Sequence, residues 1–168
     1  DTSEASMMRA LLVLLMFAAS ASADCKIRVH VANINPGCCA WASLETIGRH
    51  LGYDETQGLA EWYVKQAPDY GQASPDYIET QLREFGIEHE TCKTGDLEVL
   101  RRAARRGLPA LIGFKSSSSL GAHACVFKHI DDRHVYFHDC NHGADTFQFD
   151  IEDFKEQSSG WFVVIEPK

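Results

Sequence analysis

The sequence is poor in basic residues. It contains 16 lysines and arginines against 24 aspartates and glutamates, a formal net charge of −8 over 168 residues. Binding to phosphate groups requires an excess of lysine and arginine, so this balance argues against nucleic acid and anionic lipid as main partners. The densest basic cluster contains Arg101, Arg102, Arg105 and Arg106. Their helical spacing predicts a solvated helix face rather than a binding patch.

The chain also lacks an internal repeat, a proline-rich linker and any low-complexity tract beyond Ser116–Ser119. Hydrophobic residues make up 45% of the sequence and charged residues 24%. This composition is typical of a soluble globular protein and excludes a disordered or collagen-like chain. The length predicts a single domain.

No apolar run is long enough to span a bilayer, which needs about 20 residues. The longest, residues 10–19, follows Met7-Met8-Arg9 and precedes the small residues Ala21-Ser22-Ala23. This order predicts a secretory signal within residues 1–23, of which the first six precede any start methionine. The mature domain would then comprise residues 24–168, with 15 basic and 22 acidic residues and a charge of −7. We expect a secreted or periplasmic protein without a stable membrane anchor after signal removal.

The pattern of the mature chain predicts the α+β class, with N-terminal helices packed on a C-terminal antiparallel sheet. Helix signals, including glycine stops and the Asp96 cap, predict four helices at 38–51, 56–66, 75–85 and 96–106. A short helical turn is expected at 151–156. Alternating or apolar runs predict strands, joined as a meander, at 87–91, 108–114, 122–130, 134–138, 146–149 and 161–165, with a possible further strand at 26–32.

Six cysteines remain in the mature chain: Cys25, Cys38, Cys39, Cys92, Cys125 and Cys140. In an oxidising compartment an even number first suggests three disulfides. Cys39, however, follows a glycine-containing turn and falls in the first turn of a predicted helix. Unpaired N–H groups and the helix dipole stabilise a thiolate there, so Cys39 is a candidate nucleophile. Cys38 shares the position and is the alternative.

A cysteine nucleophile needs a histidine base, and His123 lies on a predicted strand among small residues. An acceptor must orient the imidazole. If residues 131–133 connect two antiparallel strands, Ile130 opposes His134, and both Asp139 and Asn141 share the face of His123.

The same register places Cys125 and Cys140 on opposite faces, so we expect them not to form a disulfide. Acyl transfer also needs a donor for the oxyanion. The side-chain amide of Asn33, six residues before Cys39, is a candidate for it together with the Cys39 N–H.

These residues resemble the papain-like cysteine peptidases, and most closely their compact branch of double-glycine, bacteriocin-processing-type peptidases and stand-alone relatives. The resemblance runs from Asn33 to Ile165 and is carried by residues 38–44, 121–132 and 135–139 and by the helix and strand of 96–114. It implies a papain-like fold, Cys39 as nucleophile, His123 as general base and acid, and Asp139, whose spacing fits better than that of Asn141, as orienter.

The resemblance has departures. Asn33 stands where the family usually has the oxyanion-hole glutamine, Ala40 where glycine or tryptophan is usual, and Cys140 where proline often follows the aspartate.

The predicted function is therefore a secreted cysteine peptidase that cleaves a peptide or protein substrate through a thioester, with no metal or organic cofactor. A related acyl transferase would share this chemistry. The alternatives are a catalytically silent papain-like domain that binds a peptide or protein, and a disulfide-stapled secreted module. A metal site built from Cys125, His138, Cys140 and His142 ranks below catalysis because the register scatters these ligands over two faces. With a nucleophilic cysteine, at least one other stays unpaired, and we expect this to be Cys125.

Overall fold

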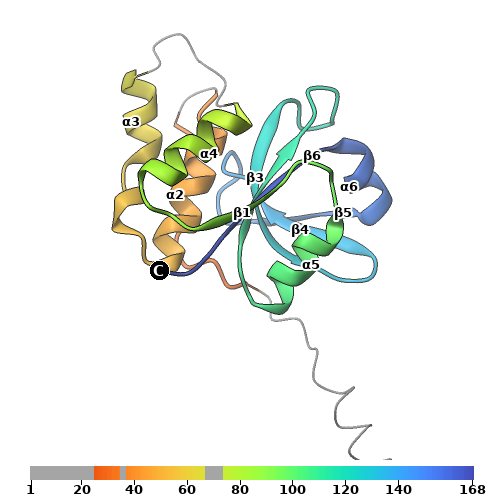
Figure 1. The fold of residues 1–168 in the computed structure, drawn as a ribbon. Helices are drawn as coiled ribbons and strands as arrows, with labels where there is room; N and C mark the ends of the chain where they lie inside the picture. The colour runs from red at the N-terminus through yellow and green to blue at the C-terminus, as the bar shows by residue number, and fades with distance from the viewer. Residues whose placement is uncertain (1–24, 35–36, 67–73) are drawn as a thin grey trace, which may run out of the picture.

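The computed structural model describes residues 25–34, 37–66 and 74–168 (Figure 1). The predicted signal segment, residues 1–23, lies outside the described residues. The helices are α2 (Cys39–Leu51), the short 3-10 helix η1 (Asp54–Thr56), α3 (Leu59–Gln66), α4 (Pro75–Glu84), α5 (Leu97–Arg105) and α6 (Ile151–Gln157). The strands are β1 (His89–Cys92), β2 (Ala110–Phe114), β3 (His123–Ile130), β4 (His134–His138), β5 (Thr146–Asp150) and β6 (Ser158–Ile165). The α+β class is confirmed, as are the four predicted helical regions.

All six strands form one antiparallel sheet in the order β1-β6-β2-β3-β4-β5. Strands β2 to β5 form the expected meander, but the last strand returns to lie between β1 and β2. A simple meander was therefore wrong for β6. Residues 161–165 are all buried, so their backbone N–H and C=O groups cannot bond to water, and pairing with β1 and β2 on the two edges satisfies them.

Helices cover both faces of this sheet, with α2, α3 and α4 on one side and α5 and α6 on the other (Figure 1). Successive side chains of each strand point to opposite faces of the sheet, so the sheet contributes to the hydrophobic core on each side. Leu111 and Val163 pack toward α2, whereas their neighbours Ile112 and Phe162 pack toward α5 and α6. The predicted packing of N-terminal helices on the sheet is confirmed, and the second helical layer completes it.

Helix α2 is fixed by its buried face and by a carboxylate. Trp41 and Ile47 are fully buried, and Gly52 ends the helix in the left-handed conformation with φ 88°, as the sequence predicted. The buried carboxylate of Glu45 accepts N–H bonds from Gly58 (2.9 Å) and Ala60 (3.1 Å) at the start of α3. This contact ties α3 to α2, the helix that carries Cys39.

The possible strand at 26–32 is wrong, because residues 25–34 have no regular secondary structure. This segment instead bonds to α2 and to the end of β4. Val31 donates its N–H to the Thr46 hydroxyl (3.0 Å), and Asn33 donates its N–H to the Cys140 carbonyl (3.0 Å). Among the described residues, no helix is long and apolar enough to cross a membrane.

A close contact between α2 and η1 yields a stability prediction. A Cβ added at Gly48 would lie 2.2 to 2.6 Å from three side-chain atoms of Thr56. We expect Gly48→Ala to lower the free energy of unfolding by about 1–3 kcal/mol, measured by urea denaturation, because the buried helix cannot move away freely. Thr56→Ala removes two of the clashing atoms, so the double variant should cost less than the sum of the single ones. Additive costs would contradict this packing.

Candidate active site

The N-terminus of α2 places Cys39 beside His123. The turn before the helix contains Gly37 at φ 90°, and Cys38 precedes the first helical residue without a side-chain cap. Burial alone would raise the pKa of the Cys39 thiol. Hydrogen bonding to His123, the imidazolium charge, and N–H bonds from Ala124 and Ala40 outweigh burial and hold this pKa below that of an ordinary cysteine. Cys38 is buried, and burial raises the pKa of its thiol.

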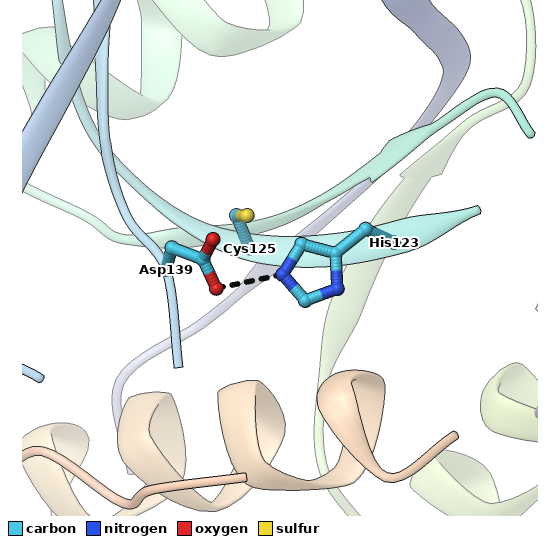
Figure 2. A group of neighbouring side chains, drawn as sticks. All are labelled: His123, Cys125 and Asp139. Carbon is cyan, nitrogen blue, oxygen red and sulfur yellow. Dashed lines mark hydrogen bonds and ion pairs between the residues drawn. The ribbon is translucent and has the colours of Figure 1, made fainter. Parts of the chain in front are cut away.

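His123 lies at the start of β3 and bonds to Asp139, the residue after β4. The distance from His123 Nε2 to the Asp139 carboxylate is 2.7 Å, and the two side chains are only 6% and 3% exposed (Figure 2). Burial opposes the imidazolium, but the bonds to Asp139, Cys125 and Cys39 prevail and raise the pKa of His123. Because Nε2 is engaged by Asp139, Nδ1 is the nitrogen left for Cys39.

The pKa of Asp139 is lowered in spite of its burial, which by itself would raise it. The His123 ring and the N–H of Asn141 both bond to the carboxylate and favour its charged form. A negative Asp139 and a positive His123 therefore stabilise each other, with both side chains almost fully covered.

The strand register that joins these residues differs from the prediction at one end. Ile130 pairs with Val135, not with His134 as predicted, because the connection is one residue longer. The Asp131 carboxylate accepts the N–H groups of Arg133 and His134, both at 2.7 Å, and so fixes this turn. A bulge between Phe127 and His129 then shifts the pairing back.

Beyond the bulge, the register at the site end is the one predicted: Phe127 pairs with Phe137 and Val126 with His138. Asp139 therefore lies on the face of His123, as predicted, but only because the bulge offsets the longer connection. The sequence did not show this bulge.

The two candidate amides lie next to each other. Asn33 Nδ2 donates to Asn141 Oδ1 at 2.9 Å, and Asn141 Nδ2 lies 3.4 Å from His123 Nε2. Asp139, not Asn141, makes the short bond to His123. Asn33 Oδ1 is buried without a hydrogen-bond partner among the described residues. Asn33 thus lies near the histidine, with one hydrogen of its Nδ2 already used by Asn141.

A pocket of about 240 Å³ opens beside Cys39 and His123. The residues that line it come mainly from the start of α2, from α4 and from strands β2, β3 and β6. Most of these residues have small or aromatic side chains. The lining residues are Gly37, Cys39, Ala40, Pro75, Gly113, Phe114, Ala122, His123, Ala124, Ser159 and Trp161. Ser159 and Trp161 carry no local sequence signal of a site, because only the return of β6 beside β2 brings them to this pocket.

The expected disulfides are not present. Cys38, Cys39, Cys92, Cys125 and Cys140 carry free thiols, and Cys25 Sγ lies 3.5 Å from a nitrogen of His50. Their surroundings differ: the Cys92 sulfur lies 3.5 Å from the Thr94 hydroxyl, and the Cys140 sulfur 3.8 Å from the Cys39 carbonyl. Burial raises the pKa of Cys125 to about 11 and that of Cys140 to about 12. The prediction of a disulfide-bonded protein is thus not supported.

Comparison with solved structures identifies the fold. A double-glycine motif protease from an AMS/PCAT transporter, solved with its leader peptide, matches with a TM-score of 0.64 at 17% identity, over 88% of this chain and 96% of that one. The peptidase domain of Streptococcus ComA, a bifunctional ABC transporter of a quorum-sensing pathway, matches with a TM-score of 0.62 at 15% identity, over 83% and 98%.

The N-terminal C39-like peptidase domain of a toxin secretion ATP-binding protein from Vibrio parahaemolyticus matches with a TM-score of 0.53 at 18% identity, over 80% and 98%. No known family profile matches the chain, and comparison with curated proteins finds no match. The fold is thus that of the C39-like, papain-like peptidase domains, as the sequence predicted.

The contrast between the adjacent thiols predicts selective alkylation. We expect iodoacetamide to modify Cys39 first, with a rate that stays high below the pH at which ordinary thiols ionise. His123→Ala removes two of the causes that lower this pKa, so the rate near pH 6 should fall about tenfold for each unit by which the pKa rises. Mass spectrometry after a brief pulse identifies the modified residue. Cys38→Ala is the matched control and should leave the rate unchanged, whereas equal modification of both cysteines would contradict this reading.

Proposed function

We propose that the protein is a cysteine peptidase with Cys39 as nucleophile, His123 as general base and acid, and Asp139 as the residue that orients His123. The main support is the chain of contacts from Cys39 through the His123 ring to Asp139. It ends in the 2.7 Å hydrogen bond between His123 and Asp139. The C39-like fold supports the proposal, since the matched proteins are named as peptidases.

The proposed reaction begins from the ion pair that the pKa shifts favour. The Cys39 thiolate attacks a substrate carbonyl carbon, and the carbonyl oxygen becomes an oxyanion. His123 donates its proton to the leaving amine as the peptide C–N bond breaks, which leaves an acyl group on the Cys39 sulfur. His123 then takes a proton from water, whose oxygen attacks the thioester and releases the acid. Asp139 stays ionised and holds the ring in place.

Two donors are proposed for the oxyanion. The N–H of Cys39 is one, because the first N–H groups of a helix have no partner within it. The second is the Nδ2 hydrogen of Asn33 that Asn141 does not use. Asn141 would then set the direction of the Asn33 amide.

We propose a peptide or protein substrate because the contacts of Cys39, His123 and Asp139 and the C39-like fold support a peptidase. The pocket beside Cys39 and His123 is large enough for a few backbone and side-chain atoms. The proposal that the protein is secreted rests on residues 1–23 alone.

An acyl transferase would use Cys39, His123 and Asp139 in the same way up to the thioester. The two activities differ only in whether water or an amine then attacks the thioester.

Peptide cleavage tests the proposal directly. We expect the mature protein to cleave a subset of a peptide library that includes Gly-Gly sequences, because one of the structures with the same fold is that of a double-glycine motif protease. Cys39→Ala should abolish cleavage, and Asp139→Asn should lower kcat by up to about 10⁴-fold, as for the corresponding residue of other triads. Mass spectrometry of the products provides the measurement. Cys38→Ala should remain active, and cleavage that survives Cys39→Ala would refute the assignment.

The oxyanion role of Asn33 is tested by side-chain length. Asn33→Ala should lower kcat by about 100- to 1000-fold with little change in KM, because the donor acts mainly in the transition state. Asn33→Gln carries the same amide on a longer arm and should retain more activity than Asn33→Ala. If the two variants behave alike and keep kcat near that of the unmodified protein, the second donor is another group.

A further inference from the structure

A buried thiol outside the proposed reaction lies against the His123–Asp139 pair. Cys125 follows His123 by two residues on β3 and is completely buried. Figure 2 shows its sulfur beside the Asp139 carboxylate, on the same strand as His123. One nitrogen of His123, the Cys125 sulfur and one Asp139 oxygen all lie within 4.8 Å of one another.

We propose that His123, Cys125 and Asp139 form a binding site for Zn²⁺, and that the bound ion holds the protein in an inactive state. The donor set is one imidazole nitrogen, one sulfur and one carboxylate oxygen, which are the three ligand types that zinc takes in proteins. Three protein ligands leave the fourth tetrahedral position for water. The site differs from the Cys125, His138, Cys140 and His142 set considered from the sequence and shares only Cys125 with it.

The spacing of the donors favours a small ion. Ligand atoms about 2.0–2.3 Å from a tetrahedral zinc lie roughly 3–4 Å from each other, so the present group needs only small side-chain shifts. The His123–Asp139 bond of 2.7 Å would open slightly as the ion replaces the shared proton. Binding releases that proton and the thiol proton of Cys125 to solvent.

Solvent approaches this group from the side of Asn141. Asn141 is exposed, and its side-chain amide lies 3.4 Å from His123 Nε2. Next to it, His142 is 57% exposed, with a ring nitrogen 3.7 Å from the second Asp139 oxygen. A displacement of the Asn141 side chain would therefore give an ion access to Nε2, on the ring edge opposite the one left for Cys39.

The inactivating effect follows from the histidine ring. With Nε2 bound to zinc, the ring carries its remaining proton on Nδ1, so no lone pair faces Cys39. A zinc-bound imidazole holds its Nδ1 proton more tightly than an imidazolium does, so His123 can neither protonate the leaving amine nor activate water. This consequence rests on the proposed peptidase function, whereas the binding of zinc does not.

Direct binding tests the site without requiring activity. In Cys39→Ala protein, which keeps all three ligands, we expect one equivalent of Zn²⁺ to bind in competition with a chromophoric chelator. Adding Cys125→Ala should weaken zinc binding by more than about 100-fold. Mutating a residue that only hydrogen-bonds to a metal ligand already lowers metal affinity by about 10- to 100-fold, and the loss of a ligand should cost more. Adding Cys140→Ala is the matched control, because it removes another buried thiol outside the set, and should leave the affinity unchanged.

Equal affinity in the Cys125→Ala and Cys140→Ala proteins would overturn the proposal. So would binding that vanishes in Cys39→Ala alone, because the ion would then be held by the nucleophile. Co²⁺ gives a second measurement that does not depend on the folding of Cys125→Ala. A sulfur-to-cobalt absorption should persist when Cys39 and Cys140 are both replaced by alanine, and its absence there would also overturn the site.

Inhibition separates the two proposals. We expect micromolar Zn²⁺ to slow peptide cleavage, with reversal by a chelator. Zinc binding at Cys125 in a protein that never cleaves peptides would refute the peptidase function and keep the site. Cleavage that continues unchanged with the site occupied would refute the inhibitory role alone.

Discussion

The bond between His123 and Asp139 is the contact on which the rest of the site depends. It joins the first residue of β3 to the residue after β4, so it forms only if these strands pair in one register. A slip by one residue would turn Asp139 to the other face of the sheet. The Asp131 turn and the bulge near Lys128 together produce the required register. The backbone N–H of Asn141 then holds the carboxylate at 2.9 Å.

The sequence predicts most of the elements because their signals are local. The glycine that ends α2 and the Asp96 cap of α5 act within one turn of the chain, and both are found in the structure. The bulge could not be predicted, because Lys128 resembles any other strand residue. The register at the site was predicted from a connection one residue too short, and the bulge compensated for that error.

Long-range packing accounts for the remaining errors. Nothing within residues 158–165 specifies which strands they join, and the position of β6 between β1 and β2 is seen only in the folded sheet. This position completes the pocket with Trp161 and Ser159. In the same way, residues 26–32 resemble a strand locally, yet Val31 bonds to a side chain of α2, and the neighbouring Asn33 bonds to the Cys140 carbonyl after β4. The placement of Asn33 follows from that choice.

The three thiols around His123 show how position, rather than residue type, determines reactivity. Cys125 and Cys140 are buried in apolar surroundings, and burial raises the pKa of each. Cys39 is also largely covered, but two N–H groups and an imidazolium face its sulfur and lower its pKa. A thiol at the start of a helix therefore becomes a nucleophile only if a strand delivers the cation beside it. The paired strands and the helix are thus one functional unit, although Cys39 and His123 lie 84 positions apart in the sequence.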